Sequence, residues 1–410
     1  MEVKFYFDTV KPYESNMLKY STYASNDWWL ISKGSMIKTV LQEMNVSVNH
    51  ISDCNSHGIY YIDVNGDPIW WNGLSQSGPP HIIKKIPKDI LNLVRNKKLR
   101  IVIAADREGG PMWNNNIDCF AETHKQISKQ KLPKNSVLIT QGNRKIKQQY
   151  QEWLQKTGNE KLFEVMYSNH FGNIFFDNKL PNRPCILSAM ENNSKDFNSL
   201  NRVYRPNRGA HIYMLIKDNI LENGIVSFNQ FNRHDDTGPK LLSCTNNEYC
   251  ETLSKIFPLH VDGNWSNTNA ANQYNSEIYY NSLLTVVTET IFVDDCTFIT
   301  EKIFKPITMG HPFIVLAGQH TMKGIREMGF RTDFGIDQSY DDIIDPTKRL
   351  YAVHEIIKDW TQKTIEEKHD ILKDALPAIE HNFKLIREKN FYHNAINDVI
   401  ENTREYYDRF

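Results

Sequence analysis

Short apolar runs alternate with amphipathic stretches along the N-terminal half of the chain. The run at 99–105, Leu-Arg-Ile-Val-Ile-Ala-Ala, has the composition and length of a central strand in a parallel sheet. Such strands, alternating with segments of helical periodicity, are typical of an α/β domain. The pattern predicts strands at 4–7, 58–62, 99–105 and 136–140, and helices at 88–96, 124–131 and 146–155.

The C-terminal half repeats this alternation. A helix predicted over 208–222 ends at Asn223-Gly224, a pair that suits a helix C-terminus. Strand, helix and strand at this spacing predict a second parallel α/β domain. We expect strands at 185–189, 225–228, 282–293, 312–316 and from 332 onward, helices at 300–309 and 320–328, and a charged helical segment at 346–410 that Pro377 interrupts.

A Pro- and Asn-rich stretch at 177–184, Asp-Asn-Lys-Leu-Pro-Asn-Arg-Pro, separates the two halves. The length of 410 residues also fits two domains better than one. We therefore predict an α/β fold with an N-terminal domain at 1–180, a C-terminal domain at 181–375 and a helical tail at 376–410. Because open parallel sheets bind ligands beyond the carboxyl ends of their strands, we expect the site in a cleft between the domains.

Charge and cysteine usage narrow the function classes. The 48 basic and 49 acidic residues give a net charge of −1, which removes the general electrostatic argument for nucleic-acid binding. Six dispersed cysteines, without a Cys-x-x-Cys pair or zinc-type spacing, favour a reducing, cytoplasmic setting. The sequence shows no signal-peptide pattern and no apolar run of bilayer length, so we expect no membrane span.

Several nucleotide-binding and hydrolase motifs are missing from the sequence. The chain has no G-x-x-x-x-G-K-[ST] and no G-x-G-x-x-G, which argues against P-loop NTPases and dinucleotide-binding enzymes. It has no G-x-S-x-G elbow of an α/β-hydrolase. It also has no Asp-x-Asp tripeptide that would hold a divalent ion on a nucleotide diphosphate, so no metal site is expected.

The first candidate segment is arginine-rich and leads into a predicted helix. Arg202, Arg205 and Arg208 lie within seven residues, and Pro206 suits the first turn of that helix. Guanidinium groups beside the free amides and positive dipole end of a helix can clamp a diphosphate. The alternative is a solvated basic loop.

The second candidate segment begins at Thr300, a suitable N-cap for the helix at 300–309. Glu301 and Lys302 then occupy the first turn, and Lys305 lies one turn further on. A carboxylate there can accept hydrogen bonds from both hydroxyls of a ribose, and the lysines can neutralise phosphate. The alternative is that the segment only caps its helix.

The sequence Phe-Ile-Thr-Glu-Lys-Ile-Phe-Lys-Pro-Ile at 298–307, followed by Gly-His-Pro-Phe-Ile-Val-Leu at 310–316, resembles a family signature. It is similar to the donor-site signature of the α-1,3-fucosyltransferase-like glycosyltransferases (family 10 and its relatives). In that family a Thr-Glu-Lys tripeptide opens a helix, and an arginine-bearing loop lies upstream. The resemblance covers mainly 185–345.

The resemblance implies a GT-B architecture of two Rossmann-like domains facing a central cleft, with a nucleotide sugar bound by the C-terminal domain. The acceptor then approaches from the N-terminal domain, and no metal is obligatory. By position, Glu301 would hold the ribose and Lys302 and Arg208 the diphosphate, with Arg205 or Arg202 assisting. The donor would be a GDP- or UDP-linked sugar acting as co-substrate, with no separate cofactor.

The third candidate segment follows the strand at 99–105. Inverting sugar transfer needs a carboxylate base that takes the proton of the acceptor hydroxyl while the nucleotide diphosphate leaves from the opposite face. Glu108, beside Gly109 and Gly110, is our candidate for this base, and Asp106 is the reserve candidate. The alternative is an exposed acidic pair bridged to Arg107.

These observations favour a metal-independent, inverting glycosyltransferase that moves a hexosyl or fucosyl unit from a nucleotide-diphosphate donor to a glycan or other hydroxyl acceptor. Two alternatives remain. One is a phage-type transferase acting on DNA bases, for which Lys84-Lys85, Lys97-Lys98 and the cluster Arg144, Lys145 and Lys147 could form a basic track. The other is a non-catalytic protein that binds nucleotide sugars.

Overall fold

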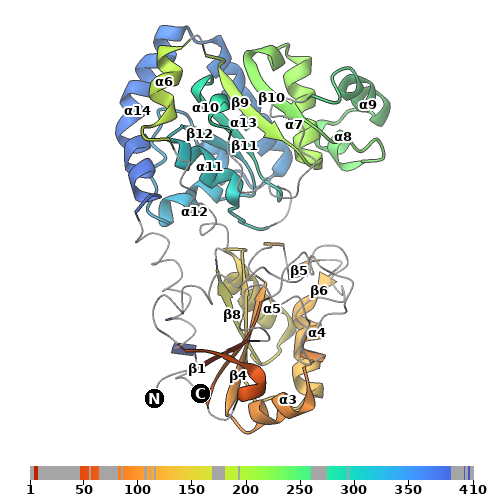
Figure 1. The fold of residues 1–410 in the computed structure, drawn as a ribbon. Coiled ribbons are helices and arrows are strands. Elements are labelled where there is room, and N and C mark those ends of the chain that lie inside the picture. The colour runs from red at the N-terminus through yellow and green to blue at the C-terminus, as the bar shows by residue number, and fades with distance from the viewer. Residues whose placement is uncertain are drawn as a thin grey trace. The chain divides into compact units, whose positions relative to one another are not determined.

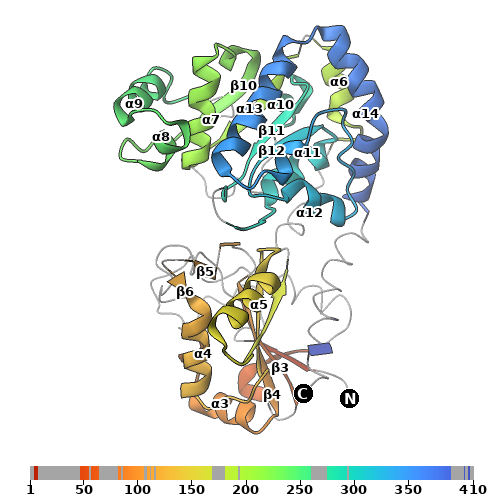
Figure 2. The same ribbon diagram turned by 180° about the vertical axis from the view of Figure 1, so that it is seen from behind.

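The computed structural model divides into two compact units (Figure 1, Figure 2). Unit 1 comprises Met1–Asn173 together with Tyr392–Phe410, and unit 2 comprises Ile174–Phe391. Within these ranges the structure describes residues 4–7, 47–54, 57–63, 82–84, 86–105, 109–110, 112–114, 117–168, 181–192, 194–259, 275–292, 295–388, 401 and 405–406.

Unit 1 is built on a six-stranded, fully parallel sheet in the order β2-β1-β3-β4-β7-β8. In chain order, the first strand lies between the second and the third, which is the doubly wound arrangement. The strands are β1 (Lys4–Phe7), β2 (Val48–His50), β3 (Gly58–Asp63), β4 (Leu99–Ala105), β7 (Val137–Gln141) and β8 (Glu164–Tyr167), and a separate antiparallel pair is formed by β5 (Trp113–Asn114) and β6 (Ile117–Asp118).

The strand predicted at 99–105 is β4, and it lies in the interior of the unit 1 sheet. All seven residues of β4 are buried, and it pairs with β3 on one side and β7 on the other. A strand enclosed by neighbours and covered on both faces needs apolar residues throughout, which explains the continuous hydrophobic run. The helices of unit 1 are α3 (Lys88–Arg95), α4 (Cys119–Lys129) and α5 (Ile146–Thr157), with the 3-10 turn η2 (Ile51–Asp53).

The end of the chain returns to unit 1. Arg100 on β4 is fully buried, and its guanidinium lies 4.2 Å from the ring centroid of Tyr406. Tyr406 is itself buried, with 6% of its surface exposed. This cation–π contact ties the last described residues of the chain to the centre of the unit 1 sheet.

Unit 2 is built on a four-stranded parallel sheet in the order β10-β9-β11-β12. The strands are β9 (Phe197–Asn201), β10 (Gly224–Phe228), β11 (Thr285–Thr288) and β12 (Phe313–Leu316). The helices are α6 (Cys185–Glu191), α7 (Pro206–Lys217), α8 (Thr237–Leu242), α9 (Asn246–Ser254), α10 (Ser276–Tyr280), α11 (Glu301–Met309), α12 (Thr321–Glu327), α13 (Pro346–Gln362) and α14 (Ile365–Leu385), with 3-10 turns η4 (Leu221–Asn223) and η6 (Ser339–Asp342).

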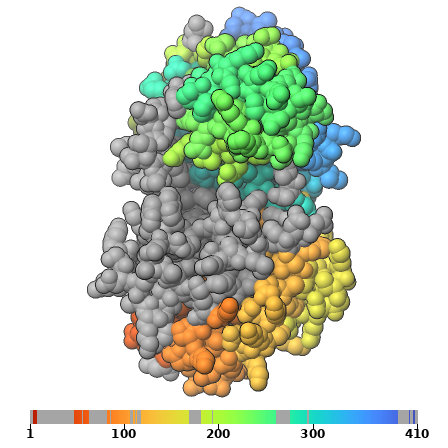
Figure 3. Space-filling view, turned by 90° about the vertical axis from the view of Figure 1, so that its right-hand side faces the viewer, coloured from red at the N-terminus to blue at the C-terminus, as the bar shows by residue number. Residues whose placement is uncertain are grey.

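Helices lie on both faces of the unit 2 sheet, and α14 lies at the opposite end of the unit from α8 and α9 in both ribbon views (Figure 1, Figure 2). The space-filling view shows the side of unit 2 that α8 and α9 form, in green (Figure 3). The predicted fold class, α/β with two parallel-sheet domains, is confirmed by the strand pairing in both units.

Three predictions about elements of unit 2 are wrong. The segment predicted as a strand at 185–189 is the helix α6, because an apolar run this short fits one face of a helix as well as a strand. The strand predicted at 282–293 is only β11, since the chain turns polar at Glu289. Thr332 does not start a strand, and Phe334 instead packs its ring 5.2 Å from that of Phe313.

The predicted interruption at Pro377 is also wrong, because α14 continues through this residue. A proline in a helix removes one backbone hydrogen bond and usually kinks or ends the helix. Here the flanking side chains of Leu372, Ala375, Ala378 and Ile379 are all buried, so packing of the helix face offsets that loss.

Candidate functional site

The strand order of unit 2 creates a topological switch point between β9 and β11. The chain leaves β9 through α7 to reach β10 on one side, and it leaves β11 through α11 to reach β12 on the other. The loops after β9 and β11 therefore diverge at the carboxyl edge of the sheet, where doubly wound folds bind their ligands. Both candidate segments predicted in this half of the sequence fall on these two loops.

The loop after β9 leads into α7, and no side chain of the N-cap residue caps the first turn of this helix. Pro206 is the first helical residue, as the sequence predicted, and the N-cap is Arg205 in an extended conformation (φ −144°, ψ 151°). The Arg205 side chain makes no capping hydrogen bond, and its Nη1 donates to the carbonyl of Tyr204 at 3.2 Å. Arg202 and Arg205 are both half-buried, and they lie in the loop that precedes the positive end of α7.

Arg208 has a different environment from the other two arginines, because it is only 4% exposed. Its Nη1 donates to the carbonyl of Val203 at 2.6 Å and its Nη2 to the carbonyl of Thr288 at 3.0 Å. Its Nε has no hydrogen-bond partner among the described residues. Burial lowers the pKa of Arg208 to about 10. Arg208 thus fastens the loop after β9 to the end of β11, and its predicted contact with diphosphate stays a prediction.

A tyrosine within the arginine-bearing loop anchors this loop to α8. The hydroxyl of Tyr204 donates to the carboxylate of Asp235 and lies 3.1 Å from the hydroxyl of Tyr249. Asp235 in turn accepts from the backbone N–H of Gly238 in the first turn of α8, at 2.9 Å. These contacts fix the backbone between Arg202 and Arg205.

The loop after β11 begins with a buried carboxylate that the sequence analysis missed. Glu289 has no exposed surface. One carboxylate oxygen accepts from the backbone N–H of Thr300 at 3.0 Å, and the Thr300 hydroxyl lies 2.8 and 2.7 Å from the two oxygens. The second oxygen also accepts from the N–H of Thr290 at 3.2 Å. Burial raises the pKa of Glu289, an effect that the nearby Lys302 ammonium opposes.

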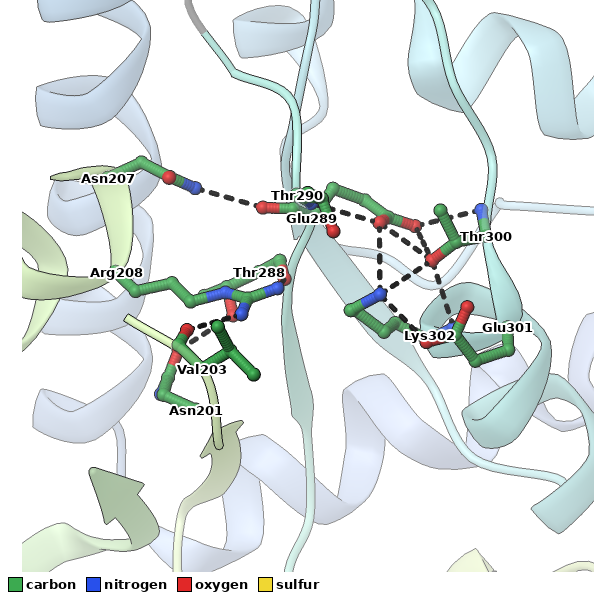
Figure 4. Close-up of polar contacts among 10 residues, drawn as sticks. All are labelled: Asn201, Val203, Asn207, Arg208, Thr288, Glu289, Thr290, Thr300, Glu301 and Lys302. Carbon is green, nitrogen blue, oxygen red and sulfur yellow. Dashed lines mark hydrogen bonds and ion pairs between the residues drawn. The ribbon is translucent and has the colours of Figure 1, made fainter. Parts of the chain in front are cut away.

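Thr300, Glu301 and Lys302 lie together at the start of α11, as predicted (Figure 4). Thr300 is the N-cap, and its hydroxyl accepts from the backbone N–H of Lys302 at 3.3 Å. The Lys302 Nζ donates to the Thr300 hydroxyl at 3.1 Å and to Glu301 at 2.8 Å, and it lies 3.8 Å from Glu289. The ammonium group is therefore held between two carboxylates.

The Glu301 carboxylate is partly accessible, with 15% of its side chain exposed. Its burial acts to raise the pKa, but the charge and hydrogen bond of Lys302, together with Lys305, outweigh that effect and hold the pKa of Glu301 below its ordinary value. Glu301 is consequently ionised at neutral pH and can accept hydrogen bonds from a ligand.

Two further contacts fix the loops that flank α11. A Cβ on Gly318, just after β12, would lie 2.0 Å from the carbonyl oxygen of Cys296, so only glycine permits this approach. Arg349 of α13 is 2% exposed and donates from Nε to the carbonyl of Ala317 at 2.9 Å and from Nη2 to that of Phe292 at 2.6 Å. Arg349 joins the loops after β11 and β12 in the way that Arg208 joins those after β9 and β11.

The candidate bases in the first half of the sequence, Glu108 and Asp106, lie outside the described residues. Among the residues that the structure does describe, no group of three or more His, Cys, Asp or Glu side chains could hold a metal ion. Within the same part of the chain, no helix is both long enough and apolar enough to cross a lipid bilayer.

No protein-family model matches the chain, and no curated protein matches it either. Among solved structures, a trehalose-6-phosphate synthase studied with bisubstrate glycomimetics is similar at 11% identity (90% of this chain, 77% of that chain, TM-score 0.43). An α,α-trehalose-6-phosphate synthase from Burkholderia multivorans is similar at 8% identity (85% and 72%, TM-score 0.40). UDP-GlcNAc 2-epimerase from Neisseria meningitidis bound to UDP-GlcNAc is similar at 12% identity (99% and 100%, TM-score 0.34).

Proposed function

We propose that this protein is a glycosyltransferase of GT-B architecture that binds a nucleotide-diphosphate sugar at the carboxyl edge of the unit 2 sheet. One observation carries the proposal. The starts of α7 and α11, on the two sides of the switch point, are joined through Glu289 and carry arginine and lysine side chains respectively. Two helix N-termini with cationic side chains are suited to a ligand that carries adjacent phosphates.

The charge of the two loops supports a diphosphate as the ligand. Arginine guanidinium groups bind phosphate oxygens in a bidentate manner, and Arg202 and Arg205 lie beside the uncapped start of α7. Lys302 and Lys305 supply positive charge from α11. As the bond to the sugar breaks, negative charge grows on the diphosphate, and these groups would stabilise it without a metal ion.

Glu301 supports a nucleoside as the other half of the ligand. It is ionised and partly accessible, and it lies in the first turn of the helix that supplies Lys302. A carboxylate has enough acceptor sites to bind both hydroxyls of a ribose. In this assignment Glu301 holds the ribose, while Lys302 and the arginines hold the diphosphate.

For the transfer step we propose inversion at the anomeric carbon without a metal ion. The acceptor hydroxyl oxygen forms a bond to the anomeric carbon, the bond from that carbon to the diphosphate oxygen breaks, and a carboxylate takes the hydroxyl proton. Glu108 is the proposed base and Asp106 its reserve. A glycan or another hydroxyl-bearing molecule is the proposed acceptor, and GDP- and UDP-sugars are the proposed donors.

The test is calorimetric binding of GDP-, UDP-, ADP- and CMP-sugars to the whole chain in the presence of EDTA. We expect one class of nucleoside-diphosphate sugar to bind in EDTA and the CMP-sugars, which carry a single phosphate, to bind more weakly. The affinity for the preferred donor should fall in Glu301→Ala. The variant Glu108→Ala should bind that donor normally and transfer no sugar. Absence of binding to every donor, in protein that unfolds cooperatively, would contradict the proposal. Donor binding without donor hydrolysis or transfer to any acceptor would indicate a non-catalytic binding protein instead.

A further inference from the structure

Glu289 connects the two helix starts through different parts of the same residue. Its main-chain carbonyl accepts from the side-chain amide of Asn207, in the first turn of α7, at 3.1 Å. Its carboxylate accepts from the N–H and hydroxyl of Thr300, the N-cap of α11. Figure 4 shows Glu289 between these partners. Thus one residue at the end of β11 contacts both sides of the switch point.

The burial of Glu289 distinguishes it from a residue that binds ligand directly. The side chain has no exposed surface, so a ligand cannot reach its oxygens. Burying a carboxylate is unfavourable unless hydrogen bonds and a nearby cation compensate for the loss of water. Thr290, Thr300 and Lys302 provide that compensation, and all three are on the loop after β11 or the first turn of α11. The carboxylate therefore fixes the conformation of the loop after β11 and of the first turn of α11.

Lys302 is the part of the segment that would change most without Glu289. Its Nζ lies 2.8 Å from Glu301 and 3.8 Å from Glu289, and it donates to the same Thr300 hydroxyl that Glu289 binds. Removing the Glu289 carboxylate would leave the Thr300 N–H and hydroxyl without their acceptor and would free Lys302 to turn toward Glu301 alone. Both changes would alter the position of the positive charge at the start of α11.

We propose that Glu289 is a positioning residue that sets the distance between the starts of α7 and α11 and aims Lys302 at the diphosphate of the bound nucleotide. This inference rests on the proposed function of the same site. It implies that Glu289 contributes more to recognition of the diphosphate than to recognition of the nucleoside.

The experiment compares the affinities of the whole chain for GDP and guanosine, and for UDP and uridine, by calorimetry. We expect Glu289→Ala to lower the affinity for the preferred nucleoside diphosphate about 10- to 100-fold and to lower nucleoside affinity by no more than about threefold. Glu289→Gln keeps an acceptor for Thr300 and removes only the charge near Lys302. We expect this variant to recover most of the lost diphosphate affinity, with a loss of about threefold remaining.

Asp341 provides a matched control in the same unit. It is 4% exposed and accepts from the backbone N–H groups of Met322 and Lys323 at the start of α12, at 2.9 Å each. Asp341→Ala therefore also removes a buried carboxylate from a helix start. We expect it to lower the unfolding temperature without a selective loss of diphosphate affinity.

The possible outcomes separate the two proposals. If the original chain binds none of the donor sugars and neither GDP nor UDP, the proposed function fails and the positioning role fails with it. If the original chain binds a nucleoside diphosphate and both Glu289 variants bind it equally well, only the positioning role is overturned. The positioning role is also overturned if Glu289→Gln, with an unchanged unfolding temperature, loses nucleoside and diphosphate affinity in parallel. It is overturned as well if Asp341→Ala reproduces the loss of affinity seen in Glu289→Ala.

Discussion

Units 1 and 2 begin with the same strand order, yet the described residues at the carboxyl ends of their sheets differ in chemistry. In unit 1, Gln141 at the end of β7 donates to the carbonyl of Gly110 at 2.7 Å. The guanidinium of Arg144 lies 4.8 Å from the ring centroid of Tyr167 at the end of β8. In unit 2, the equivalent edge carries arginines, a lysine and two carboxylates at two helix starts.

This difference shows what the doubly wound order determines and what it leaves to the side chains. The order determines where a crevice opens, because consecutive connections leave the switch point in opposite directions. It does not determine the ligand, which depends on the charges placed at that edge. The proposed division of labour, with the donor bound by unit 2, therefore depends on a few residues and can be tested one residue at a time.

The largest effect is expected when the carboxylate of unit 2 that meets the ligand is removed. Glu301→Ala should weaken binding of the preferred nucleoside diphosphate about 100-fold, or about 2.7 kcal/mol, because two ribose hydroxyls lose a charged acceptor. Calorimetry with the matching 2′,3′-dideoxynucleotide checks the assignment, since that ligand should bind the original chain and the variant with the same affinity. A variant effect that persists with the dideoxynucleotide would place Glu301 elsewhere.

A smaller effect is expected from the arginines, and here the two units can be compared directly. Arg205→Ala should weaken nucleoside diphosphate binding about tenfold, and the deficit should shrink as salt increases, because a partly exposed ionic contact is screened. Arg144→Ala removes an arginine at the corresponding edge of unit 1 and should leave that affinity unchanged. Equal losses in the two variants would contradict the assignment of donor binding to unit 2.

Acidification should destabilise unit 2 through two buried histidines. Burial lowers the pKa of His211 to about 3 and that of His311 to about 4. Below about pH 6.5 the unfolded chain therefore binds protons that the folded chain does not, so the free energy of unfolding falls. At pH 5.5 the expected loss is about 1.4 kcal/mol for each histidine.

Urea unfolding at pH 7.5 and pH 5.5 measures this loss, and His211→Gln should reduce it by about half. The Nε2 of His211 lies 3.1 Å from the Ser199 hydroxyl, and the side-chain amide of glutamine is long enough to make the same contact. An unchanged pH dependence in the variant would show that His211 is not one of the responsible groups.

The smallest effect concerns the stability of unit 1 and not the site. Tyr406→Leu keeps an apolar side chain over Arg100 and removes the aromatic ring, so we expect a loss of about 1 kcal/mol in the free energy of unfolding. Nucleotide affinity should not change, because Arg100 lies on β4 of unit 1. A loss of nucleotide binding in folded Tyr406→Leu protein would contradict the separation of roles between the units.

Local rules predicted the parts of the site that depend on neighbours in sequence. Thr300 could be recognised as an N-cap, and Pro206 as a first-turn residue, because capping involves residues only a few positions apart. Capping rules do not identify Glu289, because its partner Thr300 is eleven residues away and the strand predicted at 282–293 includes it. Its one signal is a carboxylate directly after an apolar run, a signal that Asp106 after the strand at 99–105 shares.

The contacts of Arg349 were beyond any pattern in the sequence. Two of its partners, Ala317 and Phe292, are 32 and 57 residues away, and nothing in the sequence of α13 marks Arg349 for burial. Periodicity located four of the six strands of the unit 1 sheet and three of the four strands of the unit 2 sheet, but it missed β2, β8 and β9. It also could not distinguish α6 from a strand, since seven residues span too few turns. The arrangement of charges at the site thus follows from the tertiary structure, while their presence follows from the sequence.

The close approach of Gly318 to the carbonyl of Cys296 has a consequence for engineering the site. Because no side chain fits between these two loops, a new loop after β11 would clash or leave a void unless the loop after β12 changed with it. Arg349 donates to one carbonyl in each loop, so both hydrogen bonds form only if the two loop backbones keep their relative positions. The two loops and Arg349 therefore have to be exchanged as one unit. Mutant libraries designed to change donor preference should vary both loops together.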